Sequence, residues 1–381
     1  MRKKVLMAVA NYYTSPFQVG SHHYARAFEK LGYEVLFISN PISPLHELFG
    51  DPYTFSERKE IYRKKGEEIG SISYYVPYTL LPPHNKLFLK SKFVMENWYK
   101  LTIPNILTYI KEKNFCTVDI LWFDSALFYF LLDSIKYKKS ILRLADYLGG
   151  FDDIPQIQMK KEMEIADKVD KIIYTARNLV EKYKLVNRRW KIQYVPNGVD
   201  YTFFESAVRT PPLELESIPR PRIVYVGAIR EWFDENLLYY SAVKLPNYSF
   251  VIIGPEQRDL SKIKKLQNVY LLGKQPYNKL PQFLYNSDVG IIPFDVKNCA
   301  DLVHSIHPLK LYEYMACGLP VVSVEWEELR QINSPAFLAK TPEEFVRLIE
   351  KALKVRDREK DKYIAFAKAN DWTERVKLII E

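Results

Sequence analysis

Short apolar runs recur along the chain and alternate with helical patterns. Runs of this kind, bounded by turn residues, are typical of strands buried on both faces of a parallel sheet. The first half contains such runs at residues 5–10, 34–39, 120–123, 140–143, 171–174 and 191–195. The second half contains further runs at residues 223–227, 250–254, 269–273, 289–293 and 321–324. This alternation predicts an α/β fold with two doubly wound sheets.

A proline-rich stretch separates the two series. A sharp turn at Pro196-Asn-Gly-Val-Asp200 precedes the prolines of residues 209–213 and 218–222, and such clusters mark connections between domains. We therefore predict a Rossmann-like N-terminal domain over residues 1–205 and a second over 206–361. A helical pattern over 360–377 has no strand after it, so the residues alone indicate a surface helix.

Composition limits the class of protein. Cys116, Cys299 and Cys317 are too scattered for a disulfide framework and lack metal-ligand spacing, so we expect a reducing, cytoplasmic compartment and no bound metal. The basic and apolar N-terminus is too short for the ~20 apolar residues that a membrane helix requires. We interpret it as the first strand.

Positive charge is concentrated in the first half. Residues 1–200 carry 30 Lys and Arg against 22 Asp and Glu, a net charge of +8, and the remainder carries a net charge of +1. No helix-turn-helix, zinc-finger or RNP-like pattern accompanies this excess, so we expect no nucleic-acid partner. Segment 74–113 mixes large apolar residues with lysines, which suits an anionic membrane surface; the alternative is an amphipathic helix packed on its own domain. The residues concerned are Tyr78, Leu80, Leu81, Phe88, Phe93, Trp98 and Tyr99, with Lys86, Lys90, Lys92 and Lys100.

One helix of the second half carries an unusual charge. Residues 307–323 read as a turn, a short helix with Pro308 in its first turn, a stop at Gly318 and a buried strand. Lys310 lies where the helix dipole is already positive, which is unfavourable unless an anion joins it. Glu313 shares a face with Lys310, so the pair could hold the phosphates and a hydroxyl of a nucleoside diphosphate. The alternative is a solvated Lys–Glu pair on the surface.

Polar residues in the first half follow predicted strands, where ligands of open α/β sheets bind. Gly20 opens a helix over 22–30 that Ser21 would cap, and His22 and His23 begin it; the alternative for either histidine is a backbone hydrogen bond. Asp124 and Asp146 each end a strand and could take a proton from a hydroxyl group, or could cap the next helix. Asp146 is our first choice, and the pair Asp152-Asp153 is an alternative that also resembles a helix cap.

The motifs resemble those of GT-B glycosyltransferases. Residues 316–322, Ala-Cys-Gly-Leu-Pro-Val-Val, extend the Lys310 helix into a segment similar to the donor-nucleotide signature of that group. Residues 11–26, 144–153 and 195–200 occur in the expected order, and the first two resemble the xanthan-type glucuronosyltransferases of exopolysaccharide assembly. The resemblance implies a GT-B architecture with two Rossmann-like domains facing a cleft. It also implies that a C-terminal helix, residues 362–381, crosses back to the first domain.

The resemblance also implies roles for particular residues. The general base would be Asp146, and Gly20, His22, His23 and Asp124 would lie on the acceptor side. The donor nucleotide would contact Gly227, Arg230, Gly254, Tyr277, His307, Lys310 and Glu313. Within that set Arg230 could bind the diphosphate or an acidic sugar, or pair on the surface with Glu231 or Asp234. Tyr277 could stack on the nucleotide base, or belong to the core.

The implied reaction transfers a sugar, glucuronate in this family, from a UDP-sugar to a lipid-linked oligosaccharide at the inner face of the cell membrane. Retaining relatives carry a second glutamate eight residues before the ribose-binding one, and Ser305 stands there, which favours inversion. No metal or cofactor is expected beyond the UDP-sugar, which is a substrate. Two alternatives remain: a UDP-sugar epimerase on the same fold, and a non-catalytic scaffold that binds glycan or lipid.

Overall fold

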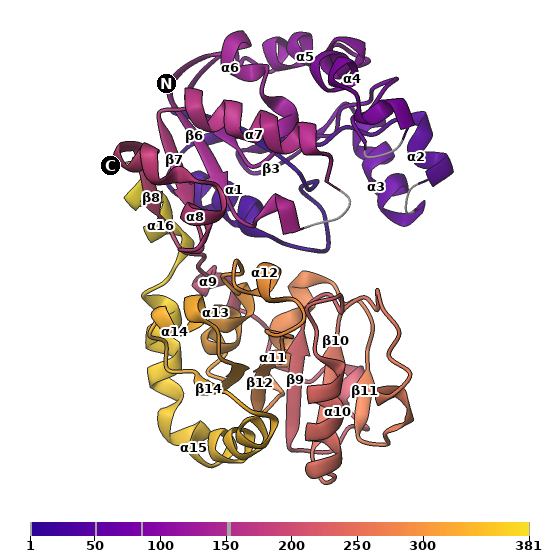
Figure 1. Ribbon diagram of the computed structural model, residues 1–381, viewed down its shortest axis with the longest axis vertical. Helices are drawn as coiled ribbons and strands as arrows, with labels where there is room; N and C mark the ends of the chain where they lie inside the picture. The colour runs from indigo at the N-terminus through magenta and orange to yellow at the C-terminus, as the bar shows by residue number, and fades with distance from the viewer. Residues whose placement is uncertain (1, 50–51, 85–86, 151–153, 381) are drawn as a thin grey trace. The chain divides into compact units, whose positions relative to one another are not determined.

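The computed structural model describes residues 2–49, 52–84, 87–150 and 154–380, which form two compact units (Figure 1). Unit 1 comprises residues 1–195 and 376–381, and unit 2 comprises residues 196–375. The two-sheet α/β architecture predicted from the apolar runs is confirmed.

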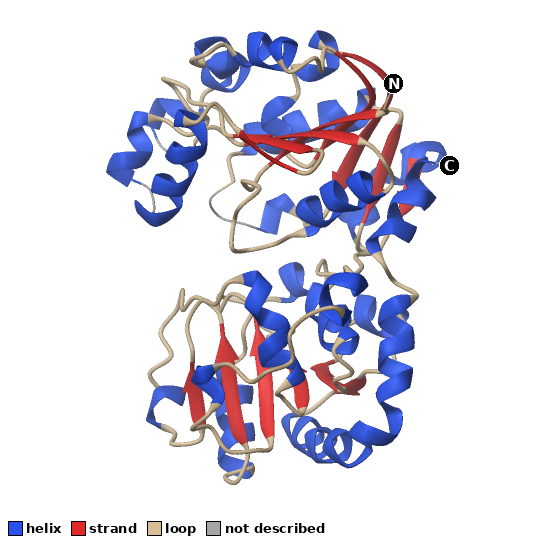
Figure 2. Ribbon diagram, turned by 180° about the vertical axis from the view of Figure 1, so that it is seen from behind, coloured by secondary structure: helices blue, strands red, loops and turns tan. Residues whose placement is uncertain are grey.

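Unit 1 is built on an eight-stranded sheet of order β3-β4-β2-β1-β5-β6-β7-β8, in which only the β3–β4 pair is antiparallel. Its apolar strands lie between helices on both faces (Figure 2). The strands are β1 (Lys4–Val9), β2 (Glu34–Ser39), β3 (Glu67–Ile69), β4 (Ile72–Tyr75), β5 (Thr117–Phe123), β6 (Lys136–Leu144), β7 (Lys171–Tyr174) and β8 (Ile192–Tyr194). The helices are α1 (Gly20–Lys30), α2 (Pro44–Phe49), α3 (Pro52–Arg63), α4 (Lys92–Asn97), α5 (Ile106–Glu112), α6 (Leu131–Ser134), α7 (Gln156–Lys168) and α8 (Leu179–Lys182).

The start of α1 differs from the sequence-based prediction. The helix begins at Gly20 with Val19 in the N-cap position, so the prediction that Ser21 caps it is wrong. The imidazole of His22 takes the capping role, because its Nδ1 accepts a hydrogen bond from the Val19 N–H at 3.0 Å. A histidine at the third helical position therefore replaces the glutamate or glutamine that usually accepts from the N-cap N–H in a capping box.

Unit 2 contains a six-stranded parallel sheet of order β11-β10-β9-β12-β13-β14. Its strands are β9 (Arg222–Val226), β10 (Ser249–Ile253), β11 (Val269–Leu271), β12 (Val289–Ile292), β13 (Val321–Val324) and β14 (Phe337–Ala339). Its helices include α9 (Tyr201–Glu205), α10 (Glu235–Lys244), α11 (Leu280–Tyr285), α12 (Ala300–Val303), α13 (Leu309–Ala316) and α14 (Glu327–Gln331). Aspartates cap two of these: Asp200 accepts from the N–H of Phe203 at the start of α9, and Asp234 accepts from Leu237 at the start of α10.

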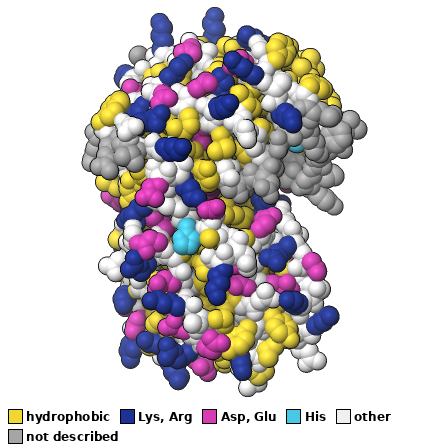
Figure 3. All heavy atoms as spheres, viewed as in Figure 1, with side chains coloured by type: hydrophobic (Ala, Val, Ile, Leu, Met, Phe, Trp, Pro, Cys, Tyr) yellow, Lys and Arg dark blue, Asp and Glu magenta, His cyan; other side chains and the backbone are white. Residues whose placement is uncertain are grey.

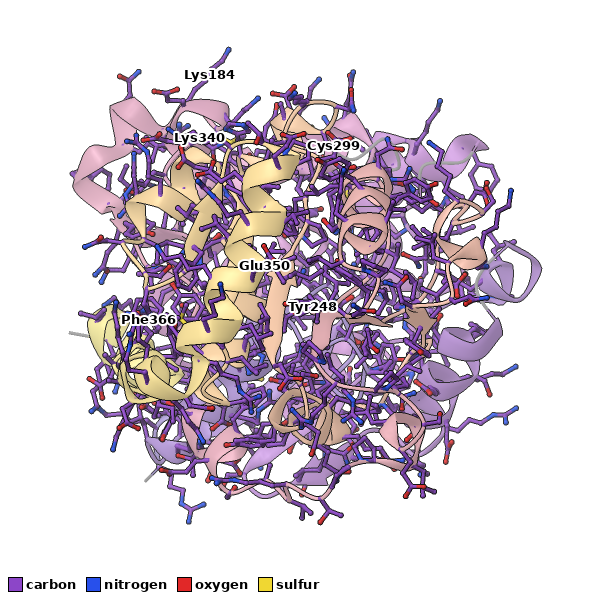
Figure 4. The ribbon with its side chains drawn as sticks, turned by 90° about the horizontal axis from the view of Figure 1, so that it is seen from below. Lys184, Tyr248, Cys299, Lys340, Glu350 and Phe366 are labelled. Atoms are coloured by element: carbon purple, nitrogen blue, oxygen red, sulfur yellow. The ribbon has the colours of Figure 1, made fainter. Side chains whose placement is uncertain are left out.

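The C-terminal segment forms two helices, so the single helix predicted over 360–377 is wrong. Helix α15 (Pro342–Lys368) packs on α10, α13 and β14, and Figure 4 shows its residues Glu350 and Phe366. The chain leaves the helix at Asn370, whose carbonyl accepts from the Val199 N–H at 3.0 Å. Asp371 then accepts from the N–H and the hydroxyl of Thr373, and α16 (Trp372–Ile380) begins. A competing backbone bond and an aspartate that starts a new helix explain the break.

Candidate functional site

Helix α13 and the turns around it form the centre of the candidate site in unit 2. The helix begins at Leu309 with Pro308 in the N-cap position, one residue outside the first turn predicted for it. At the other end Gly318 has φ +75°, and its N–H donates to the Met315 carbonyl at 2.9 Å. The predicted glycine stop is therefore confirmed, because only glycine adopts this left-handed backbone without strain.

Lys310 points from the first turn of α13 toward the end of β9. Its Nζ lies 4.7 Å from the ring centroid of Tyr225 and 4.5 Å from that of Phe294. Among the described residues no carboxylate lies within ion-pair distance of this ammonium group. Burial lowers the pKa of Lys310 to about 8, and the charge of Glu313 partly opposes this shift. A half-buried cation with aromatic neighbours and no carboxylate partner at a helix N-terminus is arranged to receive an anion.

Glu313 is buried on the same face of α13. Its Oε1 accepts a hydrogen bond from the hydroxyl of Tyr277 at 3.0 Å. Burial raises the pKa of Glu313, and the Tyr277 hydrogen bond and the Lys310 charge oppose the rise. The ring of Tyr277 in turn stacks on Phe203, with centroids 5.2 Å apart. The structure thus places Tyr277 as the residue that fixes the Glu313 carboxylate.

Two glycines lie where β9 and β10 end. Gly227 has φ +148° and Gly254 has φ +154°, and a Cβ on Gly254 would lie 1.9 Å from the Gly227 carbonyl oxygen. A Cβ on Gly227 would lie 3.0 Å from Nζ of Lys310. The backbone therefore passes close to the lysine ammonium, and neither position accommodates a side chain without movement.

Arg230 and His307 have partners within unit 2. Nε of Arg230 lies 3.4 Å from the Glu231 carboxylate, and its guanidinium lies over the Trp232 ring. The ring of His307 is buried and stacks on Tyr312, whose hydroxyl lies 3.2 Å from Nε2. Tyr312 stacks on Phe366 of α15, with ring centroids 5.5 Å apart. His307 thus joins the α13 turn to the core, whereas Arg230 stays at the surface.

In unit 1 the structure brings Gly20 and Asp124 together around Arg143, a residue that the sequence-based analysis missed. The Arg143 guanidinium pairs with the Asp124 carboxylate at 3.0 Å, and both side chains are about 5% exposed or less. The other Asp124 oxygen accepts from the Trp122 indole at 2.8 Å. A Cβ on Gly20 would lie 2.2 Å from Nη2 of Arg143, so the glycine makes room for this arginine.

The two adjacent histidines are buried and neutral. Nδ1 of His22 accepts from Val19, so Nε2 carries the proton and donates to the Tyr12 carbonyl at 3.0 Å. Burial lowers the pKa of His22 to about 4 and that of His23 well below its usual value. Arg26 lies 3.0 Å from Nδ1 of His23. Their contacts are those of residues that fix α1 on the sheet.

Asp146 follows β6 and is exposed to solvent. Its pKa is raised, chiefly because the surrounding protein removes hydration from the carboxylate; the Arg143 charge opposes the rise and the Asp124 charge adds to it. Its backbone carbonyl accepts a hydrogen bond from the Tyr183 hydroxyl at 3.1 Å. An accessible carboxylate with a raised pKa and a fixed backbone suits a general base. The alternative pair, Asp152 and Asp153, lies outside the described residues.

The basic and aromatic segment of unit 1 is partly core. Trp98 is fully buried, and its indole donates to the Leu127 carbonyl at 3.2 Å, so the prediction that it lies at an interface is wrong. Leu80, Phe88 and Phe93 are 50%, 60% and 67% exposed. Lys90, Lys92 and Lys100 are exposed as well, and Lys86 lies outside the described residues.

Membrane-spanning helices and metal-binding clusters are absent from the described residues. No helix among them is long and apolar enough to cross a membrane. In the same ranges no group of three His, Cys, Asp or Glu side chains could hold a metal ion. Charged side chains of both signs are mixed over the face drawn in Figure 3.

Each half of the chain is similar to a known protein family. Residues 7–175 match the N-terminal domain of the glucuronosyltransferase GumK, and residues 220–355 match the glycosyl transferases group 1. The putative teichuronic acid biosynthesis glycosyltransferase TuaH of Bacillus subtilis is 26% identical over 259 residues. This alignment covers 63% of the chain and 64% of TuaH, so the chain matches less than two thirds of its relative's length.

Solved structures show the same fold at low identity. Sucrose-phosphate synthase from Thermosynechococcus elongatus has a TM-score of 0.66 at 13% identity, with 99% of this chain and 97% of that chain covered. Anabaena HepE, solved in complex with UDP, has a TM-score of 0.63 at 12% identity, with 99% and 98% covered.

The two Rossmann-like sheets and these structural neighbours define a GT-B fold. On this fold, the first sheet is similar to the N-terminal domain of GumK and the second to the glycosyl transferases group 1.

Proposed function

We propose that the protein transfers glucuronate from UDP-glucuronate to a hydroxyl group of a lipid-linked oligosaccharide, with inversion and without a metal ion. The observation that carries this proposal is the Lys310 ammonium at the N-terminus of α13, half-buried and without a carboxylate partner in the described ranges. A UDP complex of the structural neighbour HepE and the GumK match support the choice of donor.

In this proposal unit 2 binds the donor. Lys310 and the first N–H groups of α13 hold the diphosphate and stabilise the charge that builds on it as the glycosidic bond breaks. Tyr277 fixes one oxygen of Glu313, which leaves the other oxygen to accept a hydrogen bond from a ribose hydroxyl. Gly227 and Gly254 let the backbone approach the phosphates. Arg230 at the surface can leave Glu231 for the sugar carboxylate, since exposed pairs contribute ~0–1 kcal/mol.

Unit 1 supplies the base. Asp146 takes the proton of the acceptor hydroxyl as that oxygen attacks the anomeric carbon. Ser305 occupies the position where retaining relatives carry a second glutamate, and its hydroxyl donates to the Asp301 carbonyl at 3.0 Å. Position 305 therefore has no carboxylate that could act on the reacting sugar. Its absence favours a single displacement with inversion.

The proposal is tested by mixing the protein with a panel of UDP-sugars and lipid-linked acceptors and by recording glycan masses together with free UDP. The expected result is an acceptor lengthened by one hexuronate, with release of one UDP for each transfer. An isomerised donor with unchanged acceptor would instead identify an epimerase. No UDP release with any donor would favour a binding scaffold.

The pH dependence of UDP binding follows from Lys310. Its pKa is about 8 in the free protein, and a bound diphosphate stabilises the protonated form. The UDP association constant should therefore be highest below pH 8 and fall as pH rises above 8, by up to about tenfold per pH unit. Phosphate, with a second pKa of about 6, keeps its charge in this range. Calorimetry at pH 8.5 in buffers of different ionisation enthalpy should show proton uptake, and binding by Lys310→Met should show none. Pronounced uptake by the variant would assign the proton to another group.

We propose that the exposed residues Leu80, Phe88 and Phe93, with Lys90 and Lys92, contact an anionic membrane at the inner face of the cell membrane. Exposed apolar side chains among cations suit the membrane–water interface. Each lysine near an anionic surface contributes about 1 kcal/mol to the binding free energy.

Flotation with vesicles containing phosphatidylglycerol should recover the protein, whereas Lys90→Glu/Lys92→Glu should reduce recovery by an order of magnitude. Lys340→Glu/Lys351→Glu, which removes two exposed lysines of unit 2, serves as the charge-matched control and should float normally. Equal flotation of both double variants, or none of the unmodified protein, would exclude this surface.

A further inference from the structure

Two aromatic rings flank the Lys310 ammonium group where three segments of unit 2 meet. Nζ lies 4.7 Å from the ring centroid of Tyr225, near the end of β9, and 4.5 Å from that of Phe294, just after β12. Both aromatic residues are buried. The face of an aromatic ring carries partial negative charge, so it attracts an ammonium group. The rings therefore supply the attraction that a carboxylate supplies in an ion pair.

The Tyr225 ring is fixed by contacts of its own. Its hydroxyl donates to the Ala228 carbonyl at 3.0 Å and so closes the turn that contains Gly227. Its ring meets Phe233 edge to face, with centroids 4.9 Å apart. A Cβ on Gly227 would lie 3.1 Å from this hydroxyl and 3.0 Å from Nζ of Lys310. One tyrosine thus shapes the turn at the end of β9 and forms one wall of the lysine site.

Phe294 also has its own packing partners. Its ring stacks on the Trp326 ring, with centroids 5.8 Å apart, and the Trp326 indole donates to the Ile306 carbonyl at 3.2 Å. A backbone bridge joins Phe294 to Phe233, the residue that packs on Tyr225. The two rings therefore belong to one connected group of buried side chains.

A ring and a carboxylate hold an ammonium group with different consequences for anion binding. A carboxylate neutralises the charge and competes with the anion for the N–H donors. A ring face attracts the ammonium group but leaves its net positive charge in place. A lysine without any partner is flexible, and ordering it when a ligand binds lowers the affinity. Rings at 4.5 and 4.7 Å avoid both costs, because they order the side chain and leave its charge for the ligand.

We propose that Tyr225 and Phe294 are positioning residues for the donor diphosphate: their ring faces hold the Lys310 ammonium group at the N-terminus of α13 and leave its N–H donors to the phosphate oxygens. This inference rests on the proposed donor site at α13. It accounts for a half-buried cation at a helix end whose dipole is unfavourable to it.

The titratable groups of this site lie on α13 and β9, and the segment after β12 contributes a ring that does not titrate. Glu313, on α13, carries the charge that partly offsets the fall in the Lys310 pKa. Tyr314, also on α13, accepts a hydrogen bond from the Val226 N–H at 2.7 Å. Burial raises the pKa of Tyr314 and of Tyr225 well above the usual value, so both hydroxyl groups stay neutral where Lys310 titrates. Because a ring face favours the protonated lysine, its removal should lower the Lys310 pKa below 8.

The first test observes Lys310 in the protein without ligand. With lysine isotope-labelled at Cε, the NMR signal that is absent from Lys310→Met should be shifted upfield by the two rings and should titrate near pH 8. Phe294→Leu and Tyr225→Leu should each reduce the upfield shift and lower the titration midpoint. Tyr225→Phe retains the ring and should keep both values. A Lys310 signal without upfield shift, or one that is the same in Phe294→Leu, would overturn the proposal.

Calorimetry with UDP measures the consequence for binding. At pH 7 Phe294→Leu and Tyr225→Leu should each bind UDP about tenfold more weakly, the effect expected when one lysine side chain must be ordered on binding. Their affinity should also begin to fall at a lower pH than in the unmodified protein. Phe345→Leu makes the same change at a buried phenylalanine of α15 and is the matched control. It should lower the melting temperature without altering UDP affinity or its pH profile. Equal losses of affinity in Phe294→Leu and Phe345→Leu would overturn the proposal.

The two measurements separate this inference from the proposed function. A UDP affinity that depends on Lys310 but on neither ring would contradict this inference alone. A ring-shifted Lys310 signal with UDP affinity unchanged by Lys310→Met would contradict the proposed donor site and, with it, the role of the rings toward a diphosphate. UDP binding that follows the rings as expected, without any sugar transfer, would contradict the proposed transfer reaction and would still support the role of the rings.

Discussion

Replacement of Asp146 by asparagine should lower the turnover of sugar transfer by about 10²–10⁴-fold while UDP binds as before. The amide keeps the shape of the side chain and cannot accept the proton of the acceptor hydroxyl. The carbonyl that accepts from Tyr183 belongs to the backbone and is retained in the variant. Turnover is measured by UDP release with saturating donor, and UDP affinity by calorimetry.

Asp124→Asn is the informative comparison, because it changes the other carboxylate near Arg143. Asp124 neutralises a buried guanidinium, so its loss leaves an uncompensated charge and should destabilise unit 1 by about 3–5 kcal/mol. Asp146→Asn should leave the free energy of unfolding nearly unchanged. Near-normal turnover of Asp146→Asn would show that Asp146 is not the base. The same conclusion would follow if the loss of activity in both variants were proportional to their loss of folding stability.

Lys310→Ala should weaken UDP binding by about 10–10²-fold at pH 7, which corresponds to the ~1.5–3 kcal/mol of a charge-assisted hydrogen bond. The pKa of about 8 means that most of the lysine is charged at this pH, so removing it removes a cation rather than a neutral amine. Calorimetric titration with UDP measures the change. Lys279→Ala, at an exposed lysine just before α11, is the control and should bind UDP normally.

Lys310→Met should stabilise the free protein. A desolvated cation without a carboxylate partner in the described ranges lowers the stability of the free protein, so Lys310→Met should raise the melting temperature while it weakens UDP binding. Unchanged affinity in both Lys310 variants would contradict the assignment of the diphosphate.

The sequence predicted those features that depend only on residues close together in the chain. The strands follow from apolar runs, and the helix α13 with its Gly318 stop follows from residues 307–323 alone. The spacing of Lys310 and Glu313 places both on one helix face whatever else surrounds them. These features depend on backbone geometry within a few residues.

Contacts between distant segments could not be predicted in the same way. Arg143 lies inside a strand pattern, and nothing nearby in the sequence indicates that its guanidinium meets Gly20 and Asp124. The break between α15 and α16 depends on a backbone bond from Val199 to Asn370, 171 positions along the chain. The basic neighbours of Trp98 in the sequence predict a surface position, yet its indole donates to the Leu127 carbonyl in another segment.

A crystal structure with bound UDP tests the central claim most directly. The account predicts the β-phosphate at the N-terminus of α13 within hydrogen-bonding distance of Nζ of Lys310, and a ribose hydroxyl on the Glu313 oxygen that Tyr277 leaves free. UDP bound elsewhere on unit 2, or bound at α13 with both side chains turned away from it, would contradict the account.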